Sequence, residues 1–174
     1  MDKNDPYDAT RADLLAALLP EVAFYGWTQK ALDAALAKSK QDADMVLLAF
    51  PKGIDDMLAY YSADGDQKML AALPDIKNAA KDMKIRDRIS HAVFLRCQID
   101  APHREAACRA AAYLSAPLFA SGRQKLAAKL LFDTANHIWH WAGDDATDYN
   151  YYSKRLILSG VLASTRLVWL RDDS

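Results

Sequence analysis

The chain has 174 residues, of which 52% are hydrophobic and 26% are charged. This length suits one domain with a sizeable core, and the hydrophobic content excludes an intrinsically disordered chain. A formal net charge of −1 gives no overall attraction to nucleic acid or to anionic lipid. No run approaches the roughly 20 consecutive apolar residues that span a bilayer, so we expect any membrane contact to be peripheral.

The spacing of apolar residues predicts an all-α protein. Apolar positions recur at intervals of three and four through most of the chain, and β-branched residues are scarce. Thr28 is a suitable N-cap, and Gly143 suits a helix end. Gly65 interrupts a long predicted helix, and its low helix propensity favours a kink or a turn at residues 63–66. The predicted helices comprise residues 6–23, 29–38, 42–49, 54–73, 83–99, 102–114, 123–141 and 148–171.

The last predicted helix is apolar around most of its circumference. A helix of this kind is buried either in the core of its own chain or by a second subunit. Ser159, Gly160, Ala163 and Ser164 form a strip of small residues that another helix could approach closely. A central core helix and a dimer interface both fit this pattern, and the dimer is our preferred interpretation.

Catalytic motifs are absent from the sequence. No nucleophile elbow, P-loop or glycine-rich dinucleotide motif occurs. A di-iron carboxylate site in a helical bundle needs several glutamates, whereas the chain has only Glu21 and Glu105. Cys97 and Cys108 form no C-x-x-C pair, and we expect both to be small core residues in a reducing compartment. We therefore predict no enzyme activity and no cofactor.

One group of residues resembles a metal site. Asp133, His137, His140 and Asp144 recur at helical spacing and fall near one helical face. Imidazole and carboxylate groups are ligands of zinc and iron, which leaves a metal-dependent hydrolase as an alternative. Asp144 lies beyond the expected helix end, and aromatic residues flank His140. Ordinary structural positions are therefore preferred, and no metal is predicted.

This chain is predicted to begin with three short helices that precede longer ones, and TetR-type repressors have the same arrangement. The second helix of their DNA-binding unit should carry residues that contact bases and phosphates. Residues 42–49 instead offer Asp42 and Asp44 followed by apolar residues, and residues 38–66 hold three lysines against six aspartates. That is the wrong sign for a surface that faces phosphate. We expect the helical plan without DNA binding; a TetR-type regulator with a lipid effector is the alternative function.

Aromatic residues gather before and within the last predicted helix. Tyrosine and tryptophan are favoured at protein and membrane interfaces. So many large rings around one glycine turn are hard to bury, and we expect some of them to be exposed for binding. The cluster comprises Trp139, Trp141, Tyr149, Tyr151 and Tyr152.

The segment around this cluster resembles a known family signature. Residues 139–155 are W-H-W-A-G-D-D-A-T-D-Y-N-Y-Y-S-K-R. They are similar to W-H-x-A-G-D-x-S-T-D-[FY]-N-W-Y-T-[KR]-R of the ubiquinone-biosynthesis accessory family, that of the ninth Coq protein. Residues 26–28, 84–89 and 169–173 also agree with this family. The signature has Ser, Trp and Thr at three positions where this chain has Ala146, Tyr151 and Ser153.

The resemblance implies a TetR-like bundle of about nine helices in one domain. A degenerate helix-turn-helix unit would occupy residues 1–52, and a ligand-binding and dimerisation body residues 53–174. Members of the family form homodimers, have lost DNA binding and bind isoprenoid lipids in a hydrophobic pocket. The family usually also carries a C-terminal amphipathic helix that lies on the membrane, and nothing after Arg171 supplies such a face.

The resemblance also implies a function and a location. The protein would present an isoprenoid quinone precursor to the di-iron demethoxyubiquinone hydroxylase, with the membrane surface as a further contact. It would act in the bacterial cytoplasm beside the inner membrane, or in the mitochondrial matrix. The residues expected to contact lipid are apolar residues of the later helices: Phe94, Leu114, Leu118, Phe119, Leu131, Trp139, Leu158 and Leu162. The residues expected to dock the hydroxylase are Tyr151, Tyr152 and Arg155.

Overall fold

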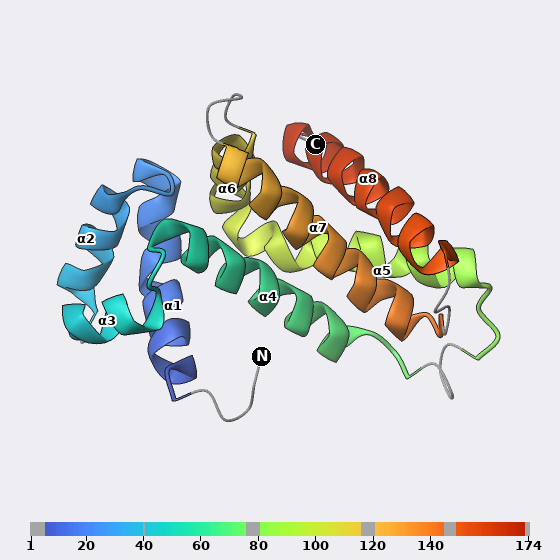
Figure 1. Cartoon of the computed structure of the whole chain (residues 1–174), viewed down its shortest axis with the longest axis horizontal. Coiled ribbons are helices and arrows are strands. Elements are labelled where there is room, and N and C mark those ends of the chain that lie inside the picture. The colour runs from blue at the N-terminus through green and yellow to red at the C-terminus, as the bar shows by residue number, and fades with distance from the viewer. Residues whose placement is uncertain (1–5, 40, 76–80, 116–120, 145–148, 173–174) are drawn as a thin grey trace. The chain divides into compact units, whose positions relative to one another are not determined.

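The computed structural model describes residues 6–39, 41–75, 81–115, 121–144 and 149–172. In these ranges it contains helices and no strand, so the predicted all-α class is confirmed (Figure 1). The α-helices are α1 (Asp8–Tyr25), α2 (Gln29–Lys38), α3 (Ala43–Ala49), α4 (Ile54–Ala72), α5 (Ile85–Asp100), α6 (Arg104–Leu114), α7 (Ser121–Trp141) and α8 (Tyr149–Arg171); a short 3-10 helix, Ala101–His103, precedes α6.

Helix boundaries follow local signals in the sequence. The Thr28 side chain accepts a hydrogen bond from the backbone N–H of Ala31, which caps the start of α2 as predicted. Gly26 and Gly143, which follow α1 and α7, have φ angles of 68° and 91°, a region that favours glycine. The sequence also predicts N-caps for the last helix at residues 145–148, which lie outside the described ranges.

The chain forms two compact units. The first comprises residues 1–63 and 103–126, and the second comprises residues 64–102 and 127–174. Both α4 and α7 therefore contribute to both units. This division differs from the predicted boundary between residues 52 and 53, because α6 and the first half of α4 pack with α1 in the first unit.

The first unit has its own core, formed by α1, α2, α3, α6 and the first half of α4. Leu14, Leu18 and Val22 recur every four residues and are fully buried on the inner face of α1, as predicted. The Trp27 indole N–H donates to the carbonyl of Ala106 at 3.1 Å. This bond ties the turn between α1 and α2 to α6.

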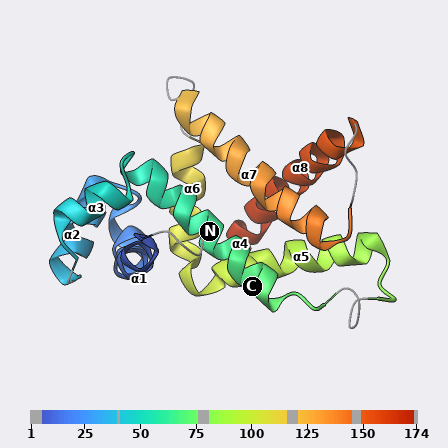
Figure 2. The same ribbon diagram turned by 60° about the horizontal axis from the view of Figure 1, so that its bottom comes forward.

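The second unit packs α5, α7, α8 and the second half of α4 around a separate core. Met69, Ala92 and Ile138 are fully buried at its centre. Figure 1 shows α8 running back in the direction opposite to α7, and Figure 2 shows that the two helices cross. In the described part of the chain, no helix is long and apolar enough to cross a membrane.

Helix α4 continues through Gly65 to Ala72, so no turn interrupts the helix there. A β-carbon at Gly65 would lie 2.6–2.9 Å from three atoms of the Arg96 guanidinium. Such distances are too short for atoms that are not bonded to each other. The position therefore requires glycine because an arginine of α5 lies against the helix there, and not because the backbone bends.

The two cysteines have different environments. Cys97 is buried on α5, whereas Cys108 is exposed on α6, so the prediction that both are core residues is wrong for Cys108. The buried face of α6 is formed by Ala106, Ala107 and Ala110. Cys108 lies outside this face because the helical repeat turns it toward solvent.

Candidate functional site

An ion-pair cluster joins the end of α7 to the start of α8; we call residues 136–144 and 149–155 the α7–α8 corner. The carboxylate of Asp144 pairs with the Lys154 ammonium at 2.6 Å and with the Arg155 guanidinium at 3.1 Å. The hydrogen bond from Lys154 lowers the pKa of Asp144, and Arg155 adds to this effect. The charged carboxylate therefore holds two residues of α8 against the end of α7.

Further hydrogen bonds connect α7 and α8 within the corner. The Tyr151 hydroxyl and Arg155 Nε both donate to Oδ1 of Asn136, at 3.1 and 2.7 Å. The Arg155 guanidinium also lies 3.6 Å from the centre of the Tyr151 ring, in a cation–π contact. The Trp139 indole donates to the backbone carbonyl of Lys154 at 3.1 Å. These bonds fix the first two turns of α8.

Two tyrosines of the corner project to solvent. Tyr149 is 83% exposed and Tyr152 is 61% exposed, which confirms that part of the aromatic cluster is available for contact. The Tyr152 ring meets the half-buried Tyr151 ring edge to face, with 5.0 Å between the ring centres. Arg155, in contrast, is only 2% exposed. Its guanidinium is engaged inside the corner, so it positions the tyrosines and presents no exposed charge.

Arg88 of α5 fastens the same corner from another helix. Its Nη1 donates to the carbonyl of Ala142 at 3.1 Å, and its Nη2 donates to the carbonyl of Lys81 at 3.2 Å. Carbonyls in the last turn of a helix lack partners within that helix, and Arg88 supplies one for the end of α7. Arg88 thus supports the α7–α8 corner from α5.

A second cluster of charges is buried between α4, α5 and α7. Arg96 pairs with Asp66 at 2.8 Å and with Asp100 at 2.9 Å. Burial by itself lowers the pKa of Arg96, but the charges of Asp100 and Asp66 outweigh burial and raise this pKa. The Thr134 hydroxyl donates to Asp66 at 2.9 Å. A hydrogen bond to the same carboxylate raises the pKa of His137.

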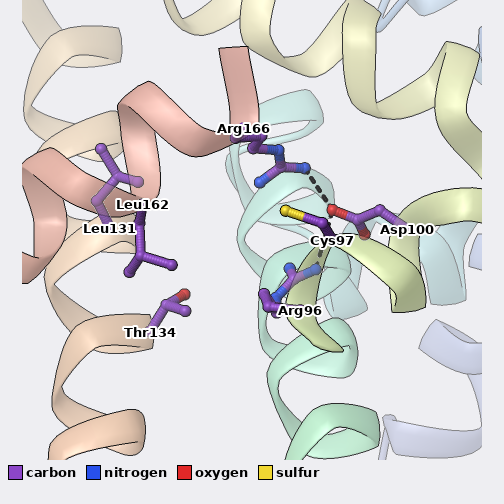
Figure 3. Close-up of a pocket in the computed structure, with 7 residues that line it drawn as sticks. All are labelled: Arg96, Cys97, Asp100, Leu131, Thr134, Leu162 and Arg166. Carbon is purple, nitrogen blue, oxygen red and sulfur yellow. Dashed lines mark ion pairs between the residues drawn. The ribbon is translucent and has the colours of Figure 1, made fainter. Parts of the chain in front are cut away.

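A small pocket adjoins this cluster, between α5, α7 and α8 (Figure 3). Its volume of about 20 Å³ accommodates roughly one water-sized group. Arg166 of α8 extends over the pocket and pairs with Asp100 at 2.8 Å. Leu131, Leu162 and Thr134 lie on one side of the pocket, and Arg96, Cys97, Asp100 and Arg166 lie on the other.

Four of the residues predicted to contact lipid lie in one cluster. Leu131 and Leu162 line the pocket. Leu158 and Trp139 pack in the same core as these two leucines, with Leu158 fully inside it and Trp139 at its edge. The later helices therefore place these four side chains in one hydrophobic core.

The other four predicted lipid residues are not joined to this cluster by the structure. Leu114 packs against the core of the first unit. Phe94 is 61% exposed on α5. Leu118 and Phe119 lie outside the described ranges. For Leu114 the apolar pattern of α6 gave no sign of which core it would join.

The four residues weighed as a metal site face different partners. Asp133 pairs with a lysine one turn before it, whereas His137 faces Asp66 at 3.3 Å. Asp144 belongs to the α7–α8 corner, and His140 is exposed. Among the described residues, no three side chains of His, Cys, Asp or Glu gather as metal ligands would. The shared helical spacing of these four residues therefore does not produce a shared site there.

Residues 124–174 match the COQ9 family model. Mitochondrial ubiquinone biosynthesis protein COQ9 of Rattus norvegicus is 28% identical over 173 residues, which cover 92% of this chain and 52% of that protein. The proteins of the same name from Homo sapiens and Drosophila melanogaster are 27% and 25% identical; the aligned regions cover 92% and 99% of this chain, and 51% and 52% of theirs. The chain is similar to these COQ9 proteins along most of its length. It spans about half the length of the curated relatives it matches.

The residues that match the COQ9 family model include the whole α7–α8 corner. The match begins in α7 and includes Asn136, Asp144 and Arg155, whose side chains hold the corner together. The resemblance inferred from residues 139–155 is thereby confirmed. Arg88 and Arg96 lie before the match, although Arg88 bonds directly to the corner.

Sequence reasoning missed the polar lining of the pocket. Arg96, Asp100, Thr134 and Arg166 were overlooked because a search for lipid contacts selects apolar residues. One signal was present: Arg96 and Asp100 are four residues apart on the same helix as the buried Val93, an arrangement that favours a paired and buried arginine. Arg166 lies 66 positions beyond its partner Asp100 in the chain, and no local pattern links the two.

Proposed function

We propose that this chain is a non-enzymatic accessory protein of ubiquinone biosynthesis that binds an isoprenoid quinone precursor. The observation that carries the proposal is the similarity to COQ9 along 92% of the chain. The pocket of the second unit supports it, because Leu131 and Leu162 line this pocket beside polar groups, and sites for small molecules combine apolar and polar residues. The sequence contributes no catalytic motif that would indicate an enzyme instead.

Lipid uptake is proposed for the region around Leu131 and Leu162. Burial of apolar area is worth about 25 cal/mol per Å², so covering a few isoprene units offsets the cost of removing them from a bilayer. An isoprenoid chain is larger than the pocket of about 20 Å³. The pocket therefore holds only a small part of such a lipid.

Native mass spectrometry of the purified protein, followed by lipid extraction, tests this proposal. We expect an isoprenoid quinone or a related long-chain lipid at near-stoichiometric amounts, or uptake of ubiquinone from liposomes by lipid-free protein. Liposomes without quinone, treated in the same way, serve as the control. Protein that is empty and takes up no quinone would rule out the carrier function.

We further propose that the exposed edge of the α7–α8 corner docks the di-iron demethoxyubiquinone hydroxylase. Tyr152 is a rigid, exposed aromatic residue, and such residues supply much of the binding energy at protein interfaces. The Tyr151 ring packs against the Tyr152 ring, and the ion pair between Arg155 and Asp144 holds the first turns of α8 in place. In this proposal Arg155 acts as a positioning residue.

Tyr152→Ala is expected to weaken capture of the hydroxylase by at least about tenfold, because the ring that contacts the partner is lost. Surface-captured hydroxylase and increasing concentrations of each variant give the affinity. Tyr25→Ala is the matched control, since Tyr25 is an exposed tyrosine of the first unit. Undiminished capture by Tyr152→Ala, with normal capture by the control, would remove this residue from the docking site.

The outer face of α8 supports a homodimer. Leu156, Ile157 and Val168 are well exposed, and Gly160 and Ser164 lie between them on the same face. A groove of small residues between two apolar rows allows a second helix to approach closely. We propose that a second copy of this chain covers this face.

DNA binding is not part of the proposed function. The outer face of α3 exposes Leu47 and Leu48 on either side of Asp44, and it offers no cation to a phosphate. The alternative of a TetR-type regulator would require a salt-dependent shift of duplex DNA, which we do not expect. The relatives are named as mitochondrial proteins. For this chain we propose the matrix, or the bacterial cytoplasm beside the inner membrane, with peripheral membrane contact.

A further inference from the structure

The charges that line the pocket compensate one another. Arg166 and Arg96 both pair with Asp100, and Arg96 also pairs with Asp66. Two guanidinium groups and two carboxylates give a local formal charge of zero when His137, which faces Asp66, is neutral. An anionic head group would add an uncompensated charge to this partly buried cluster, which is unfavourable. The electrostatics thus favour a neutral ligand group over a phosphate or a carboxylate.

Arg166 retains donor capacity at this place. Its Nη2 is engaged by Asp100 at 2.8 Å, whereas its buried Nε has no hydrogen-bond partner among the described residues. A buried N–H donor is more stable with an acceptor than without one. Figure 3 shows the guanidinium of Arg166 above Cys97, with Leu162 and Leu131 across the pocket. The site therefore combines a fixed hydrogen-bond donor with an apolar wall.

We propose that this pocket receives one oxygen atom of a neutral lipid head group, the carbonyl or hydroxyl oxygen of a quinone or phenol ring, and that Arg166 donates a hydrogen bond to it. The volume of about 20 Å³ fits a single oxygen substituent. The ring then lies against Leu131 and Leu162. This inference rests on the proposed lipid-binding function and makes Arg166 the residue that selects a quinone over an unoxygenated isoprenoid.

The test compares two probes that share a tail of two isoprene units: a short-chain ubiquinone, and geranylbenzene, which has no oxygen. Binding of each is measured by equilibrium dialysis. We expect the wild-type chain to prefer the quinone by about tenfold or more, the effect of one charge-assisted hydrogen bond. Arg166→Met keeps an apolar stem but removes the donors, so it should lose this preference and keep its affinity for geranylbenzene. Arg171→Met, on the exposed last turn of α8, is the control and should behave as the wild type.

A preference for the quinone that survives in a folded Arg166→Met variant would overturn the inference. It would mean that the ring oxygens lie elsewhere and that water fills the pocket. A measurement without any variant checks the same point: the carbonyl infrared band of ubiquinone bound to the wild type should move to lower wavenumber than in hexane. An unshifted band would also overturn the inference. Wild type that binds both probes equally refutes only the role of Arg166, whereas wild type that binds neither refutes the proposed lipid binding itself.

Discussion

Gly65→Ala should lower the free energy of unfolding by about 2–4 kcal/mol, although alanine favours helix over glycine by about 1 kcal/mol. The new β-carbon would overlap the guanidinium of Arg96. An arginine at the surface would move aside. Arg96 is buried and is held by Asp66 and Asp100, so its displacement breaks a buried ion-pair cluster. Disrupting such a cluster costs about 3–5 kcal/mol, which exceeds the gain in helix propensity.

Chemical denaturation at one protein concentration measures this effect, and a melting temperature lower by about 5–15 °C should accompany it. Gly122→Ala is the matched control, because nothing lies within 4 Å of a β-carbon at Gly122 in the first turn of α7. The control should be neutral or slightly stabilising. An unchanged or higher stability for Gly65→Ala would show that Arg96 is not held against α4 as described.

Gly160→Lys should convert a dimer of this chain into a monomer. Within the chain itself a β-carbon at Gly160 meets nothing within 4 Å and the position is exposed, so we expect the fold of one copy to tolerate the lysine. In the proposed dimer the same position lies where two α8 helices approach, and a lysine there would need burial without a partner. Leu162 is a less specific site for such a test, because it is buried in the core of its own chain.

Light scattering coupled to size exclusion gives the mass, and far-ultraviolet circular dichroism gives the helix content. We expect the mass to fall to that of one chain while the helix content stays unchanged. Gly122→Lys introduces the same residue at another open glycine and should remain dimeric. A wild type that is monomeric, or a Gly160→Lys variant that keeps the dimer mass, would contradict the proposed interface.

Local sequence determined the helices of this protein. Helix α2 begins at Gln29 and ends at Lys38 as predicted, because Thr28 caps it within three residues and the apolar period fixes its inner face. The same holds for Leu14, Leu18 and Val22 on α1. The family resemblance was also available from residues 139–155, since its motif is contiguous. These features depend on contacts between residues three or four positions apart, which the sequence displays directly.

The tertiary structure alone decided which residues from distant segments meet. Gly65 and Arg96 are 31 positions apart in the chain. Only the structure shows that the missing side chain at Gly65 leaves room for the guanidinium of Arg96. Arginine is usually exposed, yet Arg155 is buried because its guanidinium bonds to Asn136 and Asp144. Leu114 has the same apolar character as Leu131 but joins a different core. The residue type and the spacing of apolar residues indicate that a residue is buried or paired. Its partner depends on how helices far apart in the chain pack, and this packing is set by many weak contacts together.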